Sequence, residues 1–433
     1  MKILFINPWW SSKPSSSALI SRLDASNGNN LVCQILAAVT PKNHSIKMVN
    51  DGVEKIDFDS DADLVAMTTF TRSAPRTYAI ADEFRKRGKK VVLGGWHASA
   101  LPDEAKQHAD SVVIGEGEDT FPQLLKDLER KELKAFYEQE KPPDLNSVPL
   151  LTRKERKPYQ LSSFLQSIEI SKGCPVGCNF CSISYRKFGN IHRTKSIENV
   201  IRELRTIPQK IIIFSDPSLT TNPNYTKQLF REIKGLNKIF TCEGNASVLG
   251  RDDELLRLAA EAGCILWYVG FESINQETIN SIGKSTNKVE NYKNVIKKIH
   301  DYGMSLEAAL MFGFDTDGPD VFDNTLETIQ DWEIDSIDFS TLTPYPGTPL
   351  FSQLEKEGRI LTREWEKYDS LHVVFKPKQM SPEELANGVQ RMREEFYTPL
   401  KTLKRATKSI KLGLYPFVTS CLRNYKRLQN KKV

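Results

Sequence analysis

Three cysteines stand close together near the middle of this 433-residue chain, in the loop KGCPVGCNFC (172–181). Cys174, Cys178 and Cys181 are separated by three and then two residues, so their thiolates can surround one small metal site. A structural zinc usually needs a fourth protein ligand, and the nearest candidate, His192, stands eleven residues beyond the loop. A cubane iron–sulfur cluster on three thiolates leaves one iron open for another ligand. Thiolate ligands alone admit either metal, so a cluster, a zinc site and an inert cysteine loop stay open on the spacing alone.

The elements around this loop predict an open barrel. After about residue 160, six apolar runs alternate with helix-like segments: 167–171, 210–215, 239–244, 265–272, 306–314 and 336–343. Six β/α units make a partial (β/α)6 barrel rather than the closed barrel of eight, and in such folds the chemistry lies at the C-terminal ends of the strands. The cysteine loop directly follows the first of these runs, which places it at that end.

The cysteine spacing, Phe180 just before the last cysteine, and the position after the first barrel strand together resemble the signature of radical S-adenosylmethionine enzymes. The resemblance implies a 4Fe-4S cluster on Cys174, Cys178 and Cys181, whose open iron chelates S-adenosylmethionine. One electron from a reductant such as flavodoxin or ferredoxin then cleaves S-adenosylmethionine to methionine and a 5′-deoxyadenosyl radical. A cluster protein that only carries electrons is the non-enzymatic alternative.

Two other strand ends resemble segments that face S-adenosylmethionine in this superfamily. In Gly270-Phe271-Glu272-Ser273, Glu272 can accept hydrogen bonds from ribose hydroxyls or the amino group, with Ser273 beside it. Asp216 follows the second run, where the family often has paired acidic residues, but proline takes the second place here. Arg193 and Lys195 match basic residues of cobalamin-dependent relatives; they either contact cofactor or substrate or are simply solvated.

Residues 1–125 alternate short apolar runs with helical stretches, the rhythm of a parallel α/β sheet. Small or polar residues end these runs, where ligands bind in open parallel sheets. The order of these strand ends resembles the flavodoxin/Rossmann-like cobalamin-binding domain that precedes many radical enzymes. The resemblance assigns cofactor binding to Thr68, Phe70, Gly94, Gly95, Gly115, Glu116 and Gly117.

One part of the cobalamin pattern is missing. Proteins that replace the lower axial base of cobalt carry Asp-x-His-x-x-Gly after the first strand, whereas this chain has Asn-Pro-Trp-Trp-Ser-Ser (7–12). We therefore expect cobalamin without a histidine lower ligand, and His97 lies near the nucleotide tail by the same resemblance. A domain that has lost cofactor binding is the alternative.

These patterns predict four regions: a cobalamin-binding-like domain (1–125), a charged, proline-bearing linker (126–160), the barrel (161–375) and a basic helical region (376–433). The last begins with Ser381 as N-cap, Pro382 at the first helical position and Glu384 completing a capping box. Seven scattered or clustered cysteines, no apolar run of about 18 residues and a strand-like start predict a cytoplasmic protein.

Taken with cobalamin, the resemblance implies a C-methyltransferase that methylates an unactivated carbon through a substrate radical and methylcobalamin. Some relatives with the same two domains instead cyclise or rearrange carbon skeletons, so that reaction stays open. A sulfur-inserting, RNA-modifying radical enzyme would carry a second cysteine set near the N-terminus, and Cys33 alone does not supply one. No aromatic stacking motif supports a nucleic-acid substrate.

The C-terminal region adds a hint about partners. Residues 375–385 resemble the extension of lipid-acting members such as hopanoid methylases, which implies a small-molecule or lipid substrate. Residues 401–433 then contain ten Lys or Arg and no Asp or Glu, interleaved with apolar side chains. A basic amphipathic helix can lie on an anionic bilayer, here the inner membrane face; a solvated helix packed on the barrel is the alternative.

Overall fold

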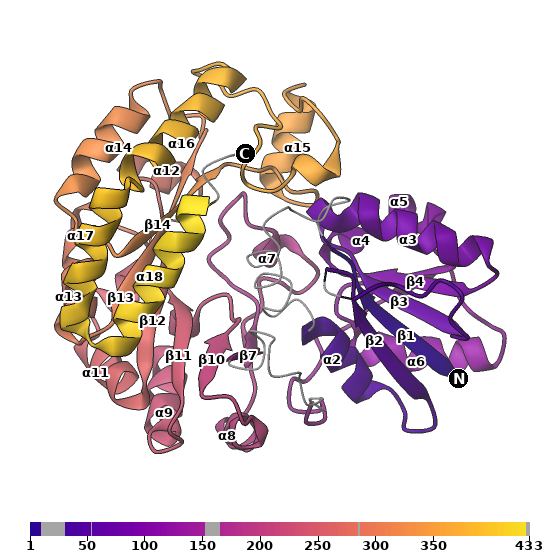
Figure 1. Ribbon diagram of the computed structural model, residues 1–433. Helices are drawn as coiled ribbons and strands as arrows, with labels where there is room; N and C mark the ends of the chain where they lie inside the picture. Colours follow the sequence, from indigo (N-terminus) through magenta and orange to yellow (C-terminus); the bar gives the residue numbers. More distant parts are fainter. Residues whose placement is uncertain (10–30, 53, 152–164, 285, 430–433) are drawn as a thin grey trace.

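The computed structural model describes residues 1–9, 31–52, 54–151, 165–284 and 286–429, which form two α/β bodies side by side (Figure 1). The N-terminal body is a six-stranded sheet in the order β2-β1-β3-β4-β5-β6, and every pair in it is parallel. Its strands are β1 (Lys2–Asn7), β2 (Ser45–Asn50), β3 (Leu64–Thr68), β4 (Lys90–Gly94), β5 (Ser111–Ile114) and β6 (Phe136–Glu138). Its helices are α2 (Leu31–Val39), α3 (Ala74–Lys86), α4 (Trp96–Ala100), α5 (Pro102–Gln107) and α6 (Gly117–Glu129).

The sheet confirms the predicted α/β class but extends beyond the expected boundary at residue 125. The range 126–160, which we predicted as a linker, contains the end of α6 and the sixth strand, β6. This strand is only three residues long and alternates exposed and buried side chains, so it carries almost no local apolar signal. Its pairing with β5 and the burial of Tyr137 hold it in the sheet.

The second body is an open, all-parallel sheet in the order β14-β13-β12-β11-β10-β7, as expected for a partial barrel. Its strands are β7 (Leu165–Ile168), β10 (Ile211–Phe214), β11 (Ile239–Gly244), β12 (Cys264–Glu272), β13 (Ser305–Phe312) and β14 (Ser336–Thr341). Its helices are α7 (Ser182–Tyr185), α8 (Ile197–Thr206), α9 (Pro223–Ile233), α10 (Ala246–Leu249), α11 (Asp253–Ala262), α12 (Gln276–Ser281), α13 (Tyr292–Asp301), α14 (Val321–Gln330) and α15 (Pro349–Lys356). The main hydrophobic core lies between this sheet and the helices outside it.

The first barrel strand is shorter at its C-terminal end than predicted. The apolar run 167–171 continues past Ile168, but the strand stops there because one oxygen of Asp216 accepts hydrogen bonds from the backbone N–H groups of Ile170 and Ser171. The chain then forms a separate two-stranded antiparallel ribbon, β8 (Ser171–Lys172) with β9 (Arg193–Thr194). The cysteine loop connects the two strands of this ribbon.

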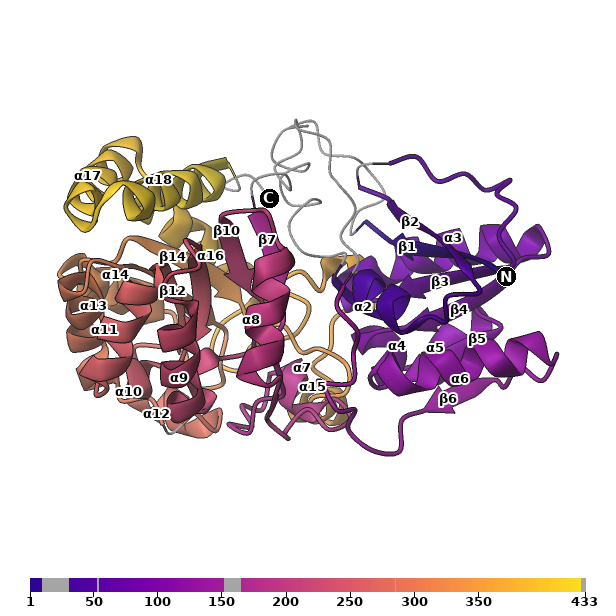
Figure 2. The ribbon, with the colours of Figure 1, turned by 90° about the horizontal axis from the view of Figure 1, so that it is seen from below.

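Three helices close the chain: α16 (Pro382–Phe396), α17 (Pro399–Ser409) and α18 (Leu414–Gln429). The predicted capping box is confirmed, since Ser381 accepts from Glu384 N–H and Glu384 from Ser381 N–H. Helices α17 and α18 form a hairpin at one end of the barrel, opposite the end that carries α7 (Figure 2). Within the described residues, no helix combines the length and the hydropathy that crossing a bilayer requires.

The α17–α18 hairpin contacts the barrel strands through Arg423 of α18. Glu243, Tyr268 and Glu307 stand opposite one another in register on β11, β12 and β13, so they share one face of the sheet. The Glu307 side chain is fully buried, and Arg423 of α18 forms an ion pair with it. At the same end, Asn424 donates to the Asp335 carbonyl, 2.9 Å away, next to the start of β14.

The two bodies share a hydrophobic core. Phe351, Trp365, Tyr368 and Val374, which follow the last barrel strand, are buried in the same cluster as α3, β3 and β4 of the N-terminal sheet. Trp365 also donates a 3.0 Å hydrogen bond to Glu104 of α5. The N-terminal body is therefore completed by residues from the far end of the chain.

Candidate active site at the body interface

The cysteine loop begins at a backbone position that only glycine can occupy. Gly173 has φ of +84°, and a Cβ there would stand 2.1 Å from the carbonyl oxygen of Ile191. Directly after it, Cys174 N–H donates to the Gly189 carbonyl over 2.8 Å. The start of the loop is thus fixed against residues 189–191, which precede β9.

The rest of the loop is held by segments that follow later strands of the barrel. Phe180 packs against Phe314, just after β13, with ring centroids 6.2 Å apart. The N–H of Asn179 donates to the Ile282 carbonyl, and its own carbonyl accepts from Leu350 N–H. The aromatic residue that marks the cysteine signature therefore anchors the loop on the barrel.

The structure brings Glu272 to the cysteines. Glu272 is buried at the end of β12, has φ of +66° and forms an ion pair with Lys284. The pKa of the Cys178 thiol is raised to about 12, chiefly by burial; the charge of Glu272 contributes to the rise and that of Lys284 opposes it. Burial alone would lower the pKa of Lys284, but the charges of Glu272 and of Cys178 raise it above its usual value.

The donor set fits an iron–sulfur cluster. Cys174 and Cys181 lie near enough to influence the Cys178 thiol electrostatically. Because metal ligands must be thiolates, binding has to supply the energy to ionise the buried Cys178 thiol. Lys284 supplies a positive charge beside the thiolates that would result.

The other two barrel residues singled out in the sequence form local structure. Asp216 is buried, and its Oδ1 also accepts a 2.7 Å hydrogen bond from the Ser171 hydroxyl. Burial raises the pKa of Asp216 to about 7, although these hydrogen bonds lower it. Its Oδ2 is buried without a hydrogen-bond partner among the described residues and can accept one from a ligand. The Ser273 hydroxyl accepts from Asn275 N–H at 3.1 Å and closes the turn after β12.

A cavity of about 180 Å³ lies at the C-terminal ends of β3, β4 and β5. All seven residues predicted to bind a cofactor in the N-terminal body line it: Thr68, Phe70, Gly94, Gly95, Gly115, Glu116 and Gly117. Apolar side chains such as Phe5, Val92 and Phe121 form much of its wall. The arrangement fits an aromatic, nucleotide-like tail of cobalamin, which needs an apolar slot and close backbone approach.

No histidine lines this cavity in the described part of the chain. His97 was expected near the tail, but it is buried on α4 and hydrogen-bonded to Glu104 at 3.1 Å. Its ring also meets Trp365, with centroids 5.1 Å apart. His97 therefore belongs to the core shared by the two bodies rather than to the cavity.

Gly95→Ala is expected to weaken cobalamin binding about tenfold. Gly95 has φ of +96°, and an added Cβ would stand 2.7 Å from the Thr68 hydroxyl and 2.8 Å from Thr69 N, at the rim of the cavity. Strain of about 1–3 kcal/mol would shift these strand ends, and 1.4 kcal/mol corresponds to tenfold in affinity. Equilibrium dialysis against hydroxocobalamin measures the change. Gly88→Ala is the control, because Gly88 also has positive φ but no atom within 4 Å of the new Cβ. Equal affinities in both variants would contradict the assignment.

The two basic residues after the loop have different surroundings. Lys195 forms an ion pair with Glu203 of α8 at 2.8 Å, inside the barrel body. Arg193 reaches across to the N-terminal body and pairs with Glu116. The predicted cofactor residue Glu116 thus lines the cavity and also binds a cation from the barrel.

Sequence reasoning missed two lysines of this region. Lys284 follows Gly283, whose positive φ lets the chain turn close to the Gly177 carbonyl, 3.3 Å from the Cβ position. A Gly-Lys pair just after a helix was the available signal. Lys172 directly precedes the cysteine loop, and its partners Glu116 and Glu118 are more than fifty residues away in sequence. No local pattern predicts that pairing.

Comparisons with known proteins agree with this two-body arrangement. The Radical SAM superfamily matches residues 168–329, the B12 binding domain matches 31–125, and a domain of unknown function (DUF4070) matches 348–419. Fold and cysteine loop together define a radical S-adenosylmethionine protein with a B12-binding domain. Among solved structures, the cobalamin-dependent S-adenosylmethionine radical enzyme OxsB with aqua-cobalamin bound aligns with a TM-score of 0.70 at 14% identity, covering 98% of this chain and 72% of that one.

Curated relatives narrow the assignment. Bacteriochlorophyllide d C-12(1)-methyltransferase of Chlorobaculum tepidum is 32% identical over 360 residues, 80% of this chain and 77% of that protein. The chain belongs to this family of cobalamin-binding radical S-adenosylmethionine enzymes. Hopanoid C-2 methylase of Rhodopseudomonas palustris is 26% identical, covering 76% of this chain and 64% of that protein, so the hopanoid resemblance holds at a lower level. The anaerobic magnesium-protoporphyrin IX monomethyl ester cyclase of Cereibacter sphaeroides is 27% identical over 77% of this chain and 60% of its own length.

Proposed function

We propose that this protein is a radical S-adenosylmethionine C-methyltransferase that acts on an unactivated carbon of a ring-containing small molecule or lipid. Its cluster would be held by Cys174, Cys178 and Cys181, with Glu272 and Asp216 offering acceptors to S-adenosylmethionine. When bound, the cluster supplies the electron that cleaves S-adenosylmethionine, and cobalamin supplies the methyl group. One observation carries the proposal: Lys172, two residues before Cys174, lines the same cavity as Thr68 and Gly95. Both cofactors would therefore meet at one interface.

The substrate class follows from the relatives rather than from a pocket. Those named above act on bacteriochlorophyllides, hopanoids and a magnesium porphyrin ester, all large and largely apolar ring systems. We propose a substrate of this kind for the present chain. Glu243, which is exposed on the shared face of β11, offers a carboxyl group there.

An anaerobic assay tests the proposal. The protein is purified without oxygen, reconstituted with iron, sulfide and hydroxocobalamin, and incubated with reductant and S-adenosylmethionine labelled with CD₃. A chlorin, a porphyrin ester and a hopanoid serve as acceptors. Methylation predicts 5′-deoxyadenosine together with CD₃ in the acceptor. 5′-Deoxyadenosine with an unlabelled, cyclised product would establish the cyclase alternative, and failure to cleave S-adenosylmethionine would reject both reactions.

We also propose that the α17–α18 hairpin contacts an anionic membrane surface. Eight large hydrophobic side chains on its described part are exposed: Leu400, Leu403, Ile410, Leu414, Tyr415, Val418, Leu422 and Tyr425. Leu400 and Leu414 are 78% and 70% exposed, in a segment rich in lysine and free of acidic residues. Exposed apolar side chains beside cations match the chemistry of an anionic bilayer.

Leu414→Glu is expected to reduce vesicle binding about tenfold, because it removes an exposed apolar side chain that would insert into the bilayer and adds a negative charge next to anionic lipid. Co-sedimentation with phosphatidylglycerol vesicles measures binding, and phosphatidylcholine vesicles give the uncharged comparison. Leu361→Glu is the matched control, since Leu361 is 52% exposed but lies outside the hairpin. Equal binding of both variants, or binding independent of lipid charge, would reject membrane contact.

A further inference from the structure

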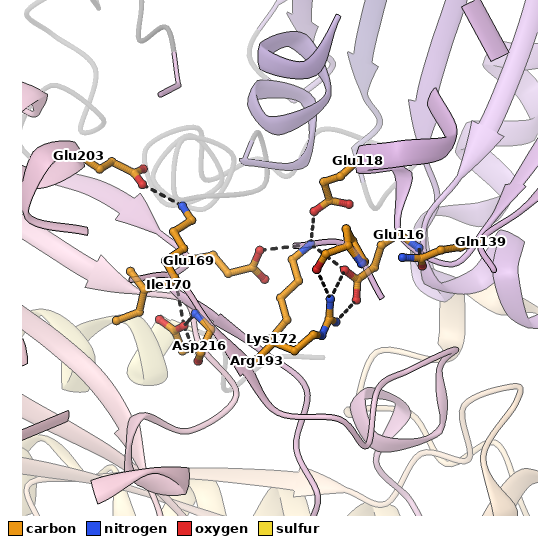
Figure 3. A network of polar contacts seen from close by, with 12 residues as sticks. Glu116, Glu118, Gln139, Glu169, Ile170, Lys172, Arg193, Glu203 and Asp216 are labelled. Atoms are coloured by element: carbon orange, nitrogen blue, oxygen red, sulfur yellow. Dashed lines mark hydrogen bonds and ion pairs between the residues drawn. The ribbon is translucent and has the colours of Figure 1, made fainter. Parts of the chain in front are cut away.

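A network of buried charges joins the cavity of the N-terminal body to the cysteine loop (Figure 3). At its centre is Lys172, whose side chain is 11% exposed. Its ammonium forms ion pairs with Glu118, with Glu116 at 3.5 Å and with Glu169 at 3.6 Å. Glu116 and Glu118 come from the N-terminal body, and their side chains are 6% and 4% exposed.

A second cation binds the same carboxylate. Arg193 stands opposite Lys172 in the β8–β9 ribbon and pairs with Glu116 through both terminal nitrogens. It also donates to the Pro143 carbonyl at 3.2 Å. Two neighbouring side chains of the ribbon, Lys172 and Arg193, thus both form ion pairs with Glu116 at the start of α6. A shift of the ribbon relative to α6 would break these ion pairs.

Each end of this link belongs to a different cofactor region. Glu116 stands between Gly115 and Gly117 and lines the cavity together with Glu118, Glu169 and Lys172. Cys174 follows Lys172 by two residues, and the glycine between them is locked by its close approach to Ile191. A displacement at Glu116 therefore passes to the cysteine loop through a short, rigid path.

Within the part of the chain that the structure describes, three side-chain donors in and around this network have no partner, and one of them, on Arg186, belongs to a barrel residue that lines the cavity. Among the described residues, Nε of Arg186, Nε of Arg193 and Nε2 of Gln139 are buried without hydrogen-bond partners. Arg186 lines the cavity and lies over the Trp96 ring, 5.3 Å from its centroid. Buried donors without partners are rare, and the peripheral amide oxygens of a corrinoid are acceptors that suit them.

We infer that Lys172, with Arg193, is a positioning residue that holds the corrinoid cavity in register with the cluster loop, and that barrel side chains form part of the corrinoid site. This inference rests on the proposed function. Lys172 acts through Glu116 and Glu118 and does not itself react. Corrinoid binding and docking of the two bodies are then coupled, since the same carboxylates serve both.

Lys172→Met tests the link. We expect at least a tenfold loss of affinity for hydroxocobalamin and a larger radius of gyration in small-angle X-ray scattering. In the reconstituted protein, relaxation enhancement of the cob(II)alamin electron paramagnetic resonance signal by the reduced cluster should weaken, because it falls steeply with distance. Lys172→Arg keeps the charge and should restore all three readouts to near the wild-type values.

Lys195→Met is the matched control. The Lys195 and Glu203 side chains are 13% and 4% exposed, as buried as Lys172 and Glu118, but both belong to the barrel body. The control should leave corrinoid affinity and scattering unchanged. If Lys172→Met does not fold, Glu118→Gln removes the partner charge and is measured in its place.

The outcomes separate the two claims. Wild-type scattering and corrinoid affinity in Lys172→Met, or equal losses in Lys195→Met, overturn the inference whatever the protein catalyses. If the wild-type protein binds no corrinoid, methyl transfer from cobalamin is rejected, and so is the corrinoid part of the inference. In that case scattering still decides whether Lys172 docks the two bodies.

Discussion

Cys178→Ala is expected to lower 5′-deoxyadenosine formation at least about 10³-fold, the equivalent of roughly 4 kcal/mol of lost transition-state stabilisation. Two remaining thiolates cannot hold the cubane that three hold with one iron open. Anaerobic reconstitution, iron and sulfide analysis, and chromatography of the nucleoside product measure the loss.

Cys242→Ala is the control for burial. Cys242 is 2% exposed and Cys178 is 7% exposed, but the Cys242 sulfur lies 3.7 Å from that of Cys264 in the barrel core. This control should keep its iron and its cleavage activity. Full cluster content and activity in Cys178→Ala would instead show that Cys178 does not bind the cluster and that the loop has a structural role.

Arg423→Met is expected to destabilise the barrel by about 1–3 kcal/mol, because it removes a charge-assisted hydrogen bond to the buried Glu307 carboxylate from an arginine that is itself 32% exposed. Methionine keeps an apolar stem in place, whereas the buried Glu307 carboxylate loses its cation. Urea unfolding followed by the fluorescence of buried Trp267 measures the change.

Two comparisons isolate the buried charge. Lys408, on the same hairpin, pairs with Glu333 of the barrel, and both side chains are more than half exposed. Lys408→Met breaks this pair and should change stability by about 0–1 kcal/mol. The double variant Glu307→Gln with Arg423→Met should recover part of the lost stability, because the buried carboxylate charge is removed together with the arginine. An Arg423→Met protein as stable as the wild type would show that the pair contributes nothing.

Local patterns were sufficient for much of the fold and for the place of the cysteine loop after the first barrel strand. The six barrel runs stand within a few residues of β7 and β10 to β14 because each is a continuous apolar stretch between turn signals. The cysteine spacing and the glycines at strand ends are likewise properties of short segments. The seven residues predicted for the cavity line one cavity because parallel strands end at one edge of the sheet.

The parts that sequence could not supply are pairings between distant segments. β6 is in the sheet only because β5 offers it a partner. Lys172 meets Glu118 across 54 positions, and Arg423 meets Glu307 across 116. A charged side chain in isolation predicts a solvated surface position. The burial and pairing of these residues arise only when the two bodies dock and the hairpin folds onto the barrel.

The shared core also constrains how the chain can be made in a cell. The N-terminal sheet ends at Glu138, but Phe351, Trp365, Tyr368 and Val374 complete its apolar core from roughly 200 residues downstream. At about 5–20 residues per second, translation takes on the order of 10–40 s to deliver them. During that interval the nascent N-terminal body leaves the ribosome with an uncovered apolar surface, which is the kind of surface that chaperones bind.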